Sequence, residues 1–173
     1  MQITLKAVKS LKHGHGDSPT FEAKVVIDGE EAGYVSNDGH GGCNEYHPWS
    51  LAAELNEYAT TLPPITYPAD ADDPESKPFT MQPDADTLIF AALTTYGIEK
   101  DFKRLVKNRV LIARTGGAIV QTKTLSPELL ERTLAKGQSE IDRLAGDRGG
   151  VALNLLPPAE ALARYRTFVE RDG

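Results

Sequence analysis

Histidine, cysteine and glycine are concentrated in two polar stretches of the N-terminal third of the chain, residues 13–18 and 37–47. These residue types can bind ions or act as acids, bases and nucleophiles. The four histidines and the single cysteine all lie there: His13, His15, His40, Cys43 and His47. Any site of the chain that uses imidazole or thiol chemistry must therefore be built from these two stretches.

The second stretch, NDGHGGCNEYH, has the composition of an anion-binding loop. Its glycines allow consecutive N–H groups to turn toward a phosphate or carboxylate ahead of a helix. The polar residues of the loop would orient the ligand, and the tyrosine would stack on a base. The predicted ligand-binding residues are Asn37, Asp38, Gly39, His40, Gly41, Gly42, Asn44 and Tyr46. The competing interpretation is that the glycines only turn the chain.

A metal site is an alternative interpretation of the same stretches. His40, Cys43 and His47 are spaced by three and four residues, and His13 or His15 would complete a tetrahedral zinc site. The protein would then be a metal-dependent hydrolase of the phosphoesterase kind. Its candidate bases are Asp17 and Asp38. No Cys-x-x-Cys or His-Glu-x-x-His pair accompanies these residues, and exposed loop histidines are the competing interpretation.

Cys43 near a helix N-terminus is a further candidate, as a nucleophile with His40 or His47 as its base. A small buried cysteine beside a turn is the simpler interpretation. The sequence favours binding without turnover over both catalytic alternatives.

A second group of candidates is basic and lies further along the chain. Lysine and arginine recur at i, i+3, i+4 and i+7 from Lys100, so they share one face of a helix. The candidate phosphate-contacting residues are Lys103, Arg104, Lys107 and Arg109. They would make the chain a nucleic-acid-contacting accessory protein through residues 100–114. A solvated face paired with Glu99 and Asp101 is the favoured interpretation, so nucleic acid is an alternative partner only.

Alternating apolar residues predict strands over residues 2–11 and 19–28, and Asp28-Gly29 predicts a hairpin turn to a third strand over 30–36. Residues 37–48 are predicted as a loop. In such a meander, the two polar stretches leave the same end of the sheet. We therefore expect them to meet in space.

An apolar stripe of Leu51, Leu55, Tyr58 and Leu62 predicts the first helix, which Pro63-Pro64 ends. Residues 63–83 hold six of the eleven prolines among acidic and small residues, which predicts an exposed segment with no packed core.

The second half of the chain predicts further helices and a hairpin. A helical pattern begins near Leu88 and breaks at Gly97, Gly116-Gly117 predicts a second hairpin, and Ser126-Pro127 begins another helix. Leu130, Leu134, Ile141 and Leu144 give the apolar stripe of one or two short helices, and a last helix follows Pro158. The predicted fold is α+β in one domain over residues 1–173, with a three-stranded antiparallel meander, a second β-hairpin and about five helices.

Composition limits the classes of function. The chain has 173 residues, 40% of them hydrophobic, and a net charge of −6. One cysteine excludes an intramolecular disulfide and fits a reducing, cytoplasmic location, and no apolar run is long enough to span a membrane. The charge is uneven, because residues 70–86 hold six acidic residues and one basic residue. A basic surface on the second half therefore stays compatible with the acidic total.

Two segments carry distinctive motifs: DGEEAGYVSNDGHGGCNEYHP, with Asp28-Gly29 and Asn37–Gly42, and LNLLPPAEALARY, with Leu153–Pro157. Together they resemble a set of small bacterial and phage proteins that have no established activity. The resemblance implies a phage or mobile-element accessory protein, such as an inhibitor or a sequestering binder, and it assigns no catalytic residues. The leading prediction is therefore a non-enzymatic protein that holds a small anionic, nucleotide-like ligand or a partner protein at the 37–47 loop.

Overall fold

The computed structural model describes residues 1–10, 20–70, 72–73, 75–137, 139–141 and 150–172. The chain divides into two compact units, Met1–Tyr96 and Gly97–Gly173, and each is described here by itself. The fold class is α+β with antiparallel sheets, which confirms the class predicted from the sequence. The expectation of one domain stays a prediction.

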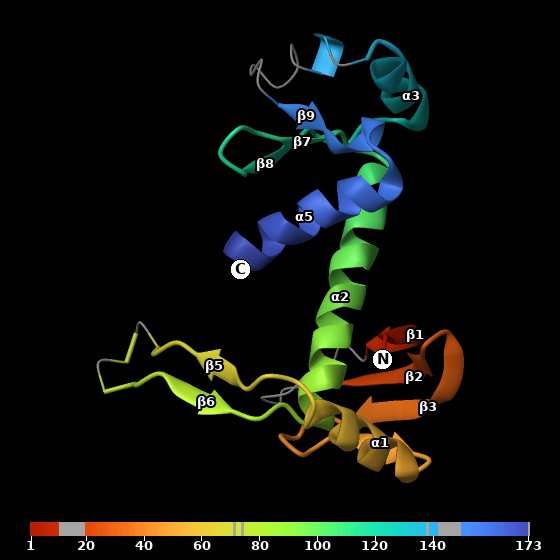
Figure 1. Ribbon diagram of the computed structural model, residues 1–173. Helices are drawn as coiled ribbons and strands as arrows, with labels where there is room; N and C mark the ends of the chain where they lie inside the picture. Colours follow the sequence, from red (N-terminus) through yellow and green to blue (C-terminus); the bar gives the residue numbers. More distant parts are fainter. Residues whose placement is uncertain (11–19, 71, 74, 138, 142–149, 173) are drawn as a thin grey trace. The chain divides into compact units, whose positions relative to one another are not determined.

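The first unit is built on a four-stranded antiparallel sheet in the order β1-β2-β3-β4, of which the first three strands are labelled in Figure 1. Its strands are β1 (Ile3–Ser10), β2 (Phe21–Ile27), β3 (Glu30–Asn37) and β4 (Glu45–His47). Asp28 and Gly29 both have positive φ angles, +50° and +93°, as the tight turn between β2 and β3 requires. The predicted three-stranded meander is therefore present, and β1, β2 and β3 pair in the expected antiparallel order.

The fourth strand is a correction to the sequence prediction, which placed residues 45–47 in a loop. Tyr46 pairs with Val35 across β3 and β4, and its half-buried ring packs against the core of the unit. Burial of this ring and the open edge of β3 account for the extra strand, because an unpaired strand edge offers backbone groups that need partners.

Two helices pack with this sheet, α1 (Ser50–Ala59) and the first part of α2 (Ala85–Val106). α1 buries Leu51, Leu55 and Ala59, so the predicted stripe is right at its start, although the helix ends before Leu62. The buried core of the unit is Leu5, Phe21, Ala23, Val25, Val35, Leu51, Leu55, Ala85, Ile89 and Ala92.

The proline-rich segment contains a short hairpin that its composition did not predict. β5 (Ile65–Tyr67) pairs with β6 (Phe79–Met81) in an antiparallel ladder. The rings of Tyr67 and Phe79 stack with centroids 5.0 Å apart, and the hydroxyl groups of Thr66 and Thr80 are hydrogen-bonded at 2.9 Å. Cross-strand pairs of this kind stabilise a hairpin without a buried core.

α2 is one continuous helix through Gly97, where the sequence predicted a break. Asp84 caps its N-terminus, because its Oδ1 atom accepts from the backbone N–H of Thr87 at 2.8 Å and from the Thr87 hydroxyl at 2.7 Å. A glycine inside a helix costs only about 1 kcal/mol relative to alanine, which packing along the rest of the helix outweighs. Ile89 contributes to the core of the first unit and Phe102 to a core of the second.

The second unit has a three-stranded sheet in the order β8-β7-β9. Its elements are β7 (Leu111–Ala113), β8 (Ile119–Gln121), α3 (Pro127–Ala135), β9 (Val151–Ala152), the 3₁₀ turn η1 (Leu153–Leu155) and α5 (Pro158–Asp172). Gly116 and Gly117 lie in the β7–β8 turn with φ angles of +101° and +89°, and Ser126 caps α3 as predicted. Of the predicted stripe, Leu130 and Ile141 are buried, and Leu144 lies outside the described residues.

Asn154 gives the Leu-Asn-x-Leu-Pro segment a structural role. Its Oδ1 atom accepts from the backbone N–H of Leu111 at 2.9 Å, and its Nδ2 atom donates to the carbonyl of Arg109 at 2.9 Å. The side chain therefore ties η1 to the start of β7, beside the buried Leu153.

Candidate functional site

The loop between β3 and β4, residues 38–44, is held together mainly by the side chain of Asn37. The Nδ2 atom of Asn37 donates to the carbonyl of Gly42 and to Oδ1 of Asn44, both at 3.1 Å. Its Oδ1 atom accepts from the backbone N–H of the buried Gly39 at 2.8 Å. One asparagine at the end of β3 thus fixes both ends of the loop.

Asp86, in the first turn of α2, connects this loop to the helix. Its Oδ1 atom accepts from the Asn44 side chain at 2.9 Å and from the Tyr46 hydroxyl at 2.6 Å. Its Oδ2 atom accepts a longer bond, 3.4 Å, from the backbone N–H of Asn44. Burial raises the pKa of Tyr46 far above its usual range, and the hydrogen bond to Asp86 raises it further. The tyrosine is therefore a neutral donor that orients the carboxylate.

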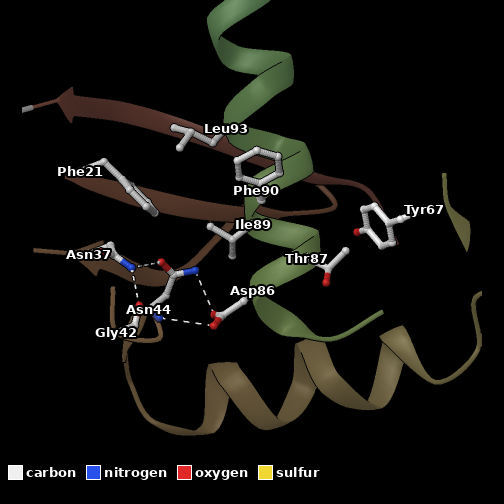
Figure 2. A pocket seen from close by; sticks show the side chains of 10 residues that line it. All are labelled: Phe21, Asn37, Gly42, Asn44, Tyr67, Asp86, Thr87, Ile89, Phe90 and Leu93. Atoms are coloured by element: carbon white, nitrogen blue, oxygen red, sulfur yellow. Dashed lines mark hydrogen bonds between the residues drawn. The ribbon is translucent and has the colours of Figure 1, made fainter. Parts of the chain in front are cut away.

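A cleft of about 300 Å³ lies beside this network, and Figure 2 shows the side chains that line it. We call it the Asp86 cleft. Its lining residues are Phe21, Asn37, Gly42, Asn44, Tyr67, Asp86, Thr87, Ile89, Phe90 and Leu93. They come from β2, β3, the 38–44 loop, β5 and α2, so segments far apart in the sequence converge at one place.

The cleft has a polar side and an apolar side. Asp86, Ile89, Phe90 and Leu93 recur at i, i+3, i+4 and i+7 on α2, which places them on one face of the helix. Ile89 is fully buried, whereas the neighbouring Phe90 is 62% exposed. An exposed phenylalanine beside a hydrogen-bonded carboxylate is the combination expected where a partly apolar group is bound.

Three of the predicted ligand-binding residues line the cleft, namely Asn37, Gly42 and Asn44. The others have different places. Asp38 and His40 are exposed, with Nδ1 of His40 3.2 Å from Oδ2 of Asp38, and the hydrogen bond from the backbone N–H of His40 lowers the pKa of Asp38. Gly39 and Gly41 turn the chain with φ angles near +80°. Tyr46, predicted to stack on a base, instead packs against the core and binds Asp86.

Some backbone N–H groups of the loop already donate hydrogen bonds to side chains of the same segment. The N–H of Gly39 donates to Asn37, and the N–H of His40 donates to Asp38 at 3.0 Å. Among the described residues that line the Asp86 cleft, none is basic and Asp86 is acidic. The electrostatics of the cleft therefore favour a neutral or cationic group over an anion.

Sequence reasoning missed Asp86 and the rings of Phe21, Tyr67 and Phe90, which we call the aromatic wall of the cleft. Asp86 was counted with the acidic residues 70–86, whose composition indicates a solvated segment. The available signal was spacing, because Asp86 precedes Ile89 and Leu93 by three and seven residues and so shares their helical face. Nothing in the sequence indicated that Tyr67 would lie near this face.

The histidine and cysteine cluster is only partly described. His13, His15 and Asp17 lie outside the described residues. Cys43 and His47 are both exposed, and His40 is paired with Asp38. Over the residues that the structure does describe, no group of three or more histidine, cysteine, aspartate or glutamate side chains could hold a metal ion.

The basic face of α2 is partly neutralised by neighbouring acids. Lys103 pairs with Glu99 at 3.4 Å, and Arg104 pairs with Asp101 at 3.1 Å. Arg109 donates to the side chain of Gln121 at 2.8 Å. α2 ends at Val106, so the exposed Lys107, predicted on the same helical face, lies beyond the helix. Nucleic-acid contact through residues 100–114 stays a prediction.

Comparison with protein-family models, with curated proteins and with solved structures gives no match. The resemblance to phage proteins therefore has no support from these comparisons. Within the described part of the chain, no helix is long and apolar enough to cross a membrane.

Proposed function

We propose that the first unit is a binding module that holds a planar, nitrogen-containing ring of the nucleobase kind in the Asp86 cleft, without turnover. The observation that carries this proposal is the Asp86 carboxylate, which is fixed by Asn44 and Tyr46 beside an aromatic wall. A ring with an amino group satisfies both sides of such a cleft.

The polar side of the Asp86 cleft favours a ligand that donates a hydrogen bond. A carboxylate has about four acceptor positions. Oδ1 of Asp86 accepts two bonds, whereas Oδ2 accepts only the long bond from Asn44 among the described residues. Oδ2 therefore has capacity for one donor from a ligand, such as an exocyclic amine.

The apolar side supports a flat ring. Phe90 offers most of its surface to solvent, and Phe21, Leu93 and Tyr67 line the same space. Stacking of a base on an aromatic side chain is worth about 1–3 kcal/mol. A cavity of about 300 Å³ is at the small end of ligand sites and suits a single ring system.

The same features support binding rather than catalysis. Among the described residues that line the cleft, the ionisable side chains are Asp86 and Tyr67, and Asp86 is already held by three hydrogen bonds. A phosphate attached to the ring is the less favoured part of the predicted nucleotide-like ligand, because no described lining residue is basic. We propose a sequestering role for such a site, because its described lining residues favour binding without turnover.

The test is calorimetric titration of the full chain with adenosine and with purine riboside, which lacks the amino group. We expect adenosine to bind and purine riboside to bind about tenfold more weakly, since a hydrogen bond to a charged group contributes about 1.5–3 kcal/mol. Equal affinity for the two would refute the role of Asp86. Absence of binding across adenosine, guanosine and cytidine would refute the nucleobase proposal.

A pair of variants localises the binding. Phe90→Ala should weaken adenosine binding about tenfold through lost stacking. Trp49→Ala removes another exposed aromatic ring, 82% exposed, that does not line the cleft, and should change the affinity less than about twofold. Equal effects of the two substitutions would place the ligand elsewhere.

A further inference from the structure

A second cleft lies within the second unit, and three arginines line it. Arg114, Arg164 and Arg171 surround a space of about 280 Å³, together with the apolar side chains of Ile119 and Phe168. We call it the arginine cleft. No acidic residue lines it among those that the structure describes.

The arginines converge because two elements face the same space. Arg164, Phe168 and Arg171 are spaced i, i+4 and i+7 on α5, so they share one face of that helix. Arg114 comes from the other side, at the start of the turn between β7 and β8. Its backbone N–H donates to the carbonyl of Ala118 at 2.8 Å and its carbonyl accepts from Gly117 at 2.9 Å, which closes the turn.

Arg171 is held in place by the turn. Its Nη1 atom donates to the carbonyl of Gly116 at 3.1 Å. Its guanidinium packs so closely on Gly117 that a Cβ atom at that position would overlap it. Glycine at position 117 therefore provides both the φ angle of +89° and the room for the arginine.

Arg164 is held more loosely. It forms an ion pair with Glu160 at 3.0 Å, and both side chains are about half exposed. An exposed pair of this kind contributes little to stability, about 0–1 kcal/mol. The guanidinium can therefore turn from Glu160 to a stronger anion at small cost.

We propose that the arginine cleft binds the phosphate group of a small phosphate ester or diphosphate. Guanidinium groups stay charged at all accessible pH values, and their planar donors match phosphate oxygens in pairs. Phe168 and Ile119 contact the apolar remainder of the ligand. This site is independent of the Asp86 cleft and needs no property of the first unit.

The test uses the full chain and inorganic pyrophosphate. This ion has no nucleobase, so its binding does not depend on the proposed function of the Asp86 cleft. Calorimetry at low ionic strength should give saturable binding with one ion per chain. Arg164→Gln should weaken it about tenfold, because a charge-assisted hydrogen bond is lost. Arg104→Gln removes the same charge outside the cleft and should change the dissociation constant less than about twofold.

Two results would overturn the proposal. One is the absence of saturable pyrophosphate binding to the unmodified chain. The other is an equal loss in Arg164→Gln and Arg104→Gln, which would indicate a general basic surface of the kind that contacts nucleic acid.

A glycine pair tests the position of Arg171 without changing any charge. Gly116 and Gly117 both have positive φ angles, so alanine strains the turn in either position, but only at Gly117 does the new Cβ displace Arg171. We expect Gly117→Ala to weaken pyrophosphate binding about tenfold and Gly116→Ala less than about twofold. Equal affinities of the two variants would contradict the placement of Arg171 in the site.

Discussion

Tyr46→Phe removes one oxygen atom, the hydroxyl that donates to Asp86 at 2.6 Å. The ring of Tyr46 stays available for packing against the core of the first unit. The substitution therefore isolates the hydrogen bond that orients the carboxylate from the hydrophobic contribution of the ring.

The expected cost follows from the surroundings of that bond. A hydrogen bond to a charged group contributes about 1.5–3 kcal/mol net. Tyr46 is only half-buried and Asp86 keeps both donors of Asn44, so the loss belongs at the lower end of the range. We expect the free energy of unfolding to fall by about 1.5 kcal/mol at neutral pH.

Urea denaturation of the two proteins as a function of pH is the assay. Burial and the bond to Asp86 raise the pKa of Tyr46 in the folded chain, whereas an unfolded tyrosine titrates near pH ~10. The stabilisation is therefore fully present below pH ~10 and is lost as the pH rises through the folded pKa. The difference in the free energy of unfolding between the unmodified chain and Tyr46→Phe should therefore become smaller in strong alkali.

Tyr67→Phe is the matched control, because the hydroxyl of Tyr67 lies on an exposed hairpin and its ring contact with Phe79 remains. It should change stability by less than about 0.5 kcal/mol. A Tyr46→Phe effect no larger than that of Tyr67→Phe would refute the view that this hydroxyl holds Asp86 in place.

Three further changes test local features by urea denaturation. Asn37→Ala should lower the free energy of unfolding by about 2 kcal/mol, because three hydrogen bonds that hold the loop are lost. Asp38→Ala, its control, should lower it by less than about 0.5 kcal/mol, and equal losses would contradict the assigned role of Asn37. Asp84→Ala should cost about 1 kcal/mol at neutral pH. Its hydrogen bonds from Thr87 lower the pKa of Asp84, so this difference is present above pH ~4 and should disappear as the pH falls through the folded pKa. Gly97→Ala should raise stability by about 0.8 kcal/mol, since a Cβ there meets no atom within 4 Å; a loss of stability would argue against a continuous α2.

Local signals in the sequence predicted most of the regular elements. The Asp28-Gly29 turn, the Ser126 cap and the Gly116-Gly117 hairpin each depend on a few adjacent residues, and all three are present. β4 and the β5–β6 hairpin were missed because their three-residue strands are joined to their partners by long loops, whereas the equally short β7 and β8 flank the Gly116-Gly117 turn signal. Short runs of this kind carry no periodicity to detect.

The candidate site was predicted only in part, because it joins a loop visible in the local sequence to residues that are distant in sequence. The 37–47 stretch was identified by composition, and three of its residues, Asn37, Gly42 and Asn44, line the cleft. Asp86 lies 42 residues beyond Asn44, and only the packing of α2 against the sheet brings the two together. A composition count placed Asp86 among solvated acids, whereas tertiary structure makes it the anchor of the loop.

The most direct test of the Asp86 cleft as a ligand site is a titration of the isotope-labelled chain with adenosine, followed by amide NMR. We expect saturable shifts at Asn44, Thr87 and Phe90, with one dissociation constant for all three. Saturable shifts confined to the second unit, or none at any adenosine concentration, would contradict a ligand site in the first unit.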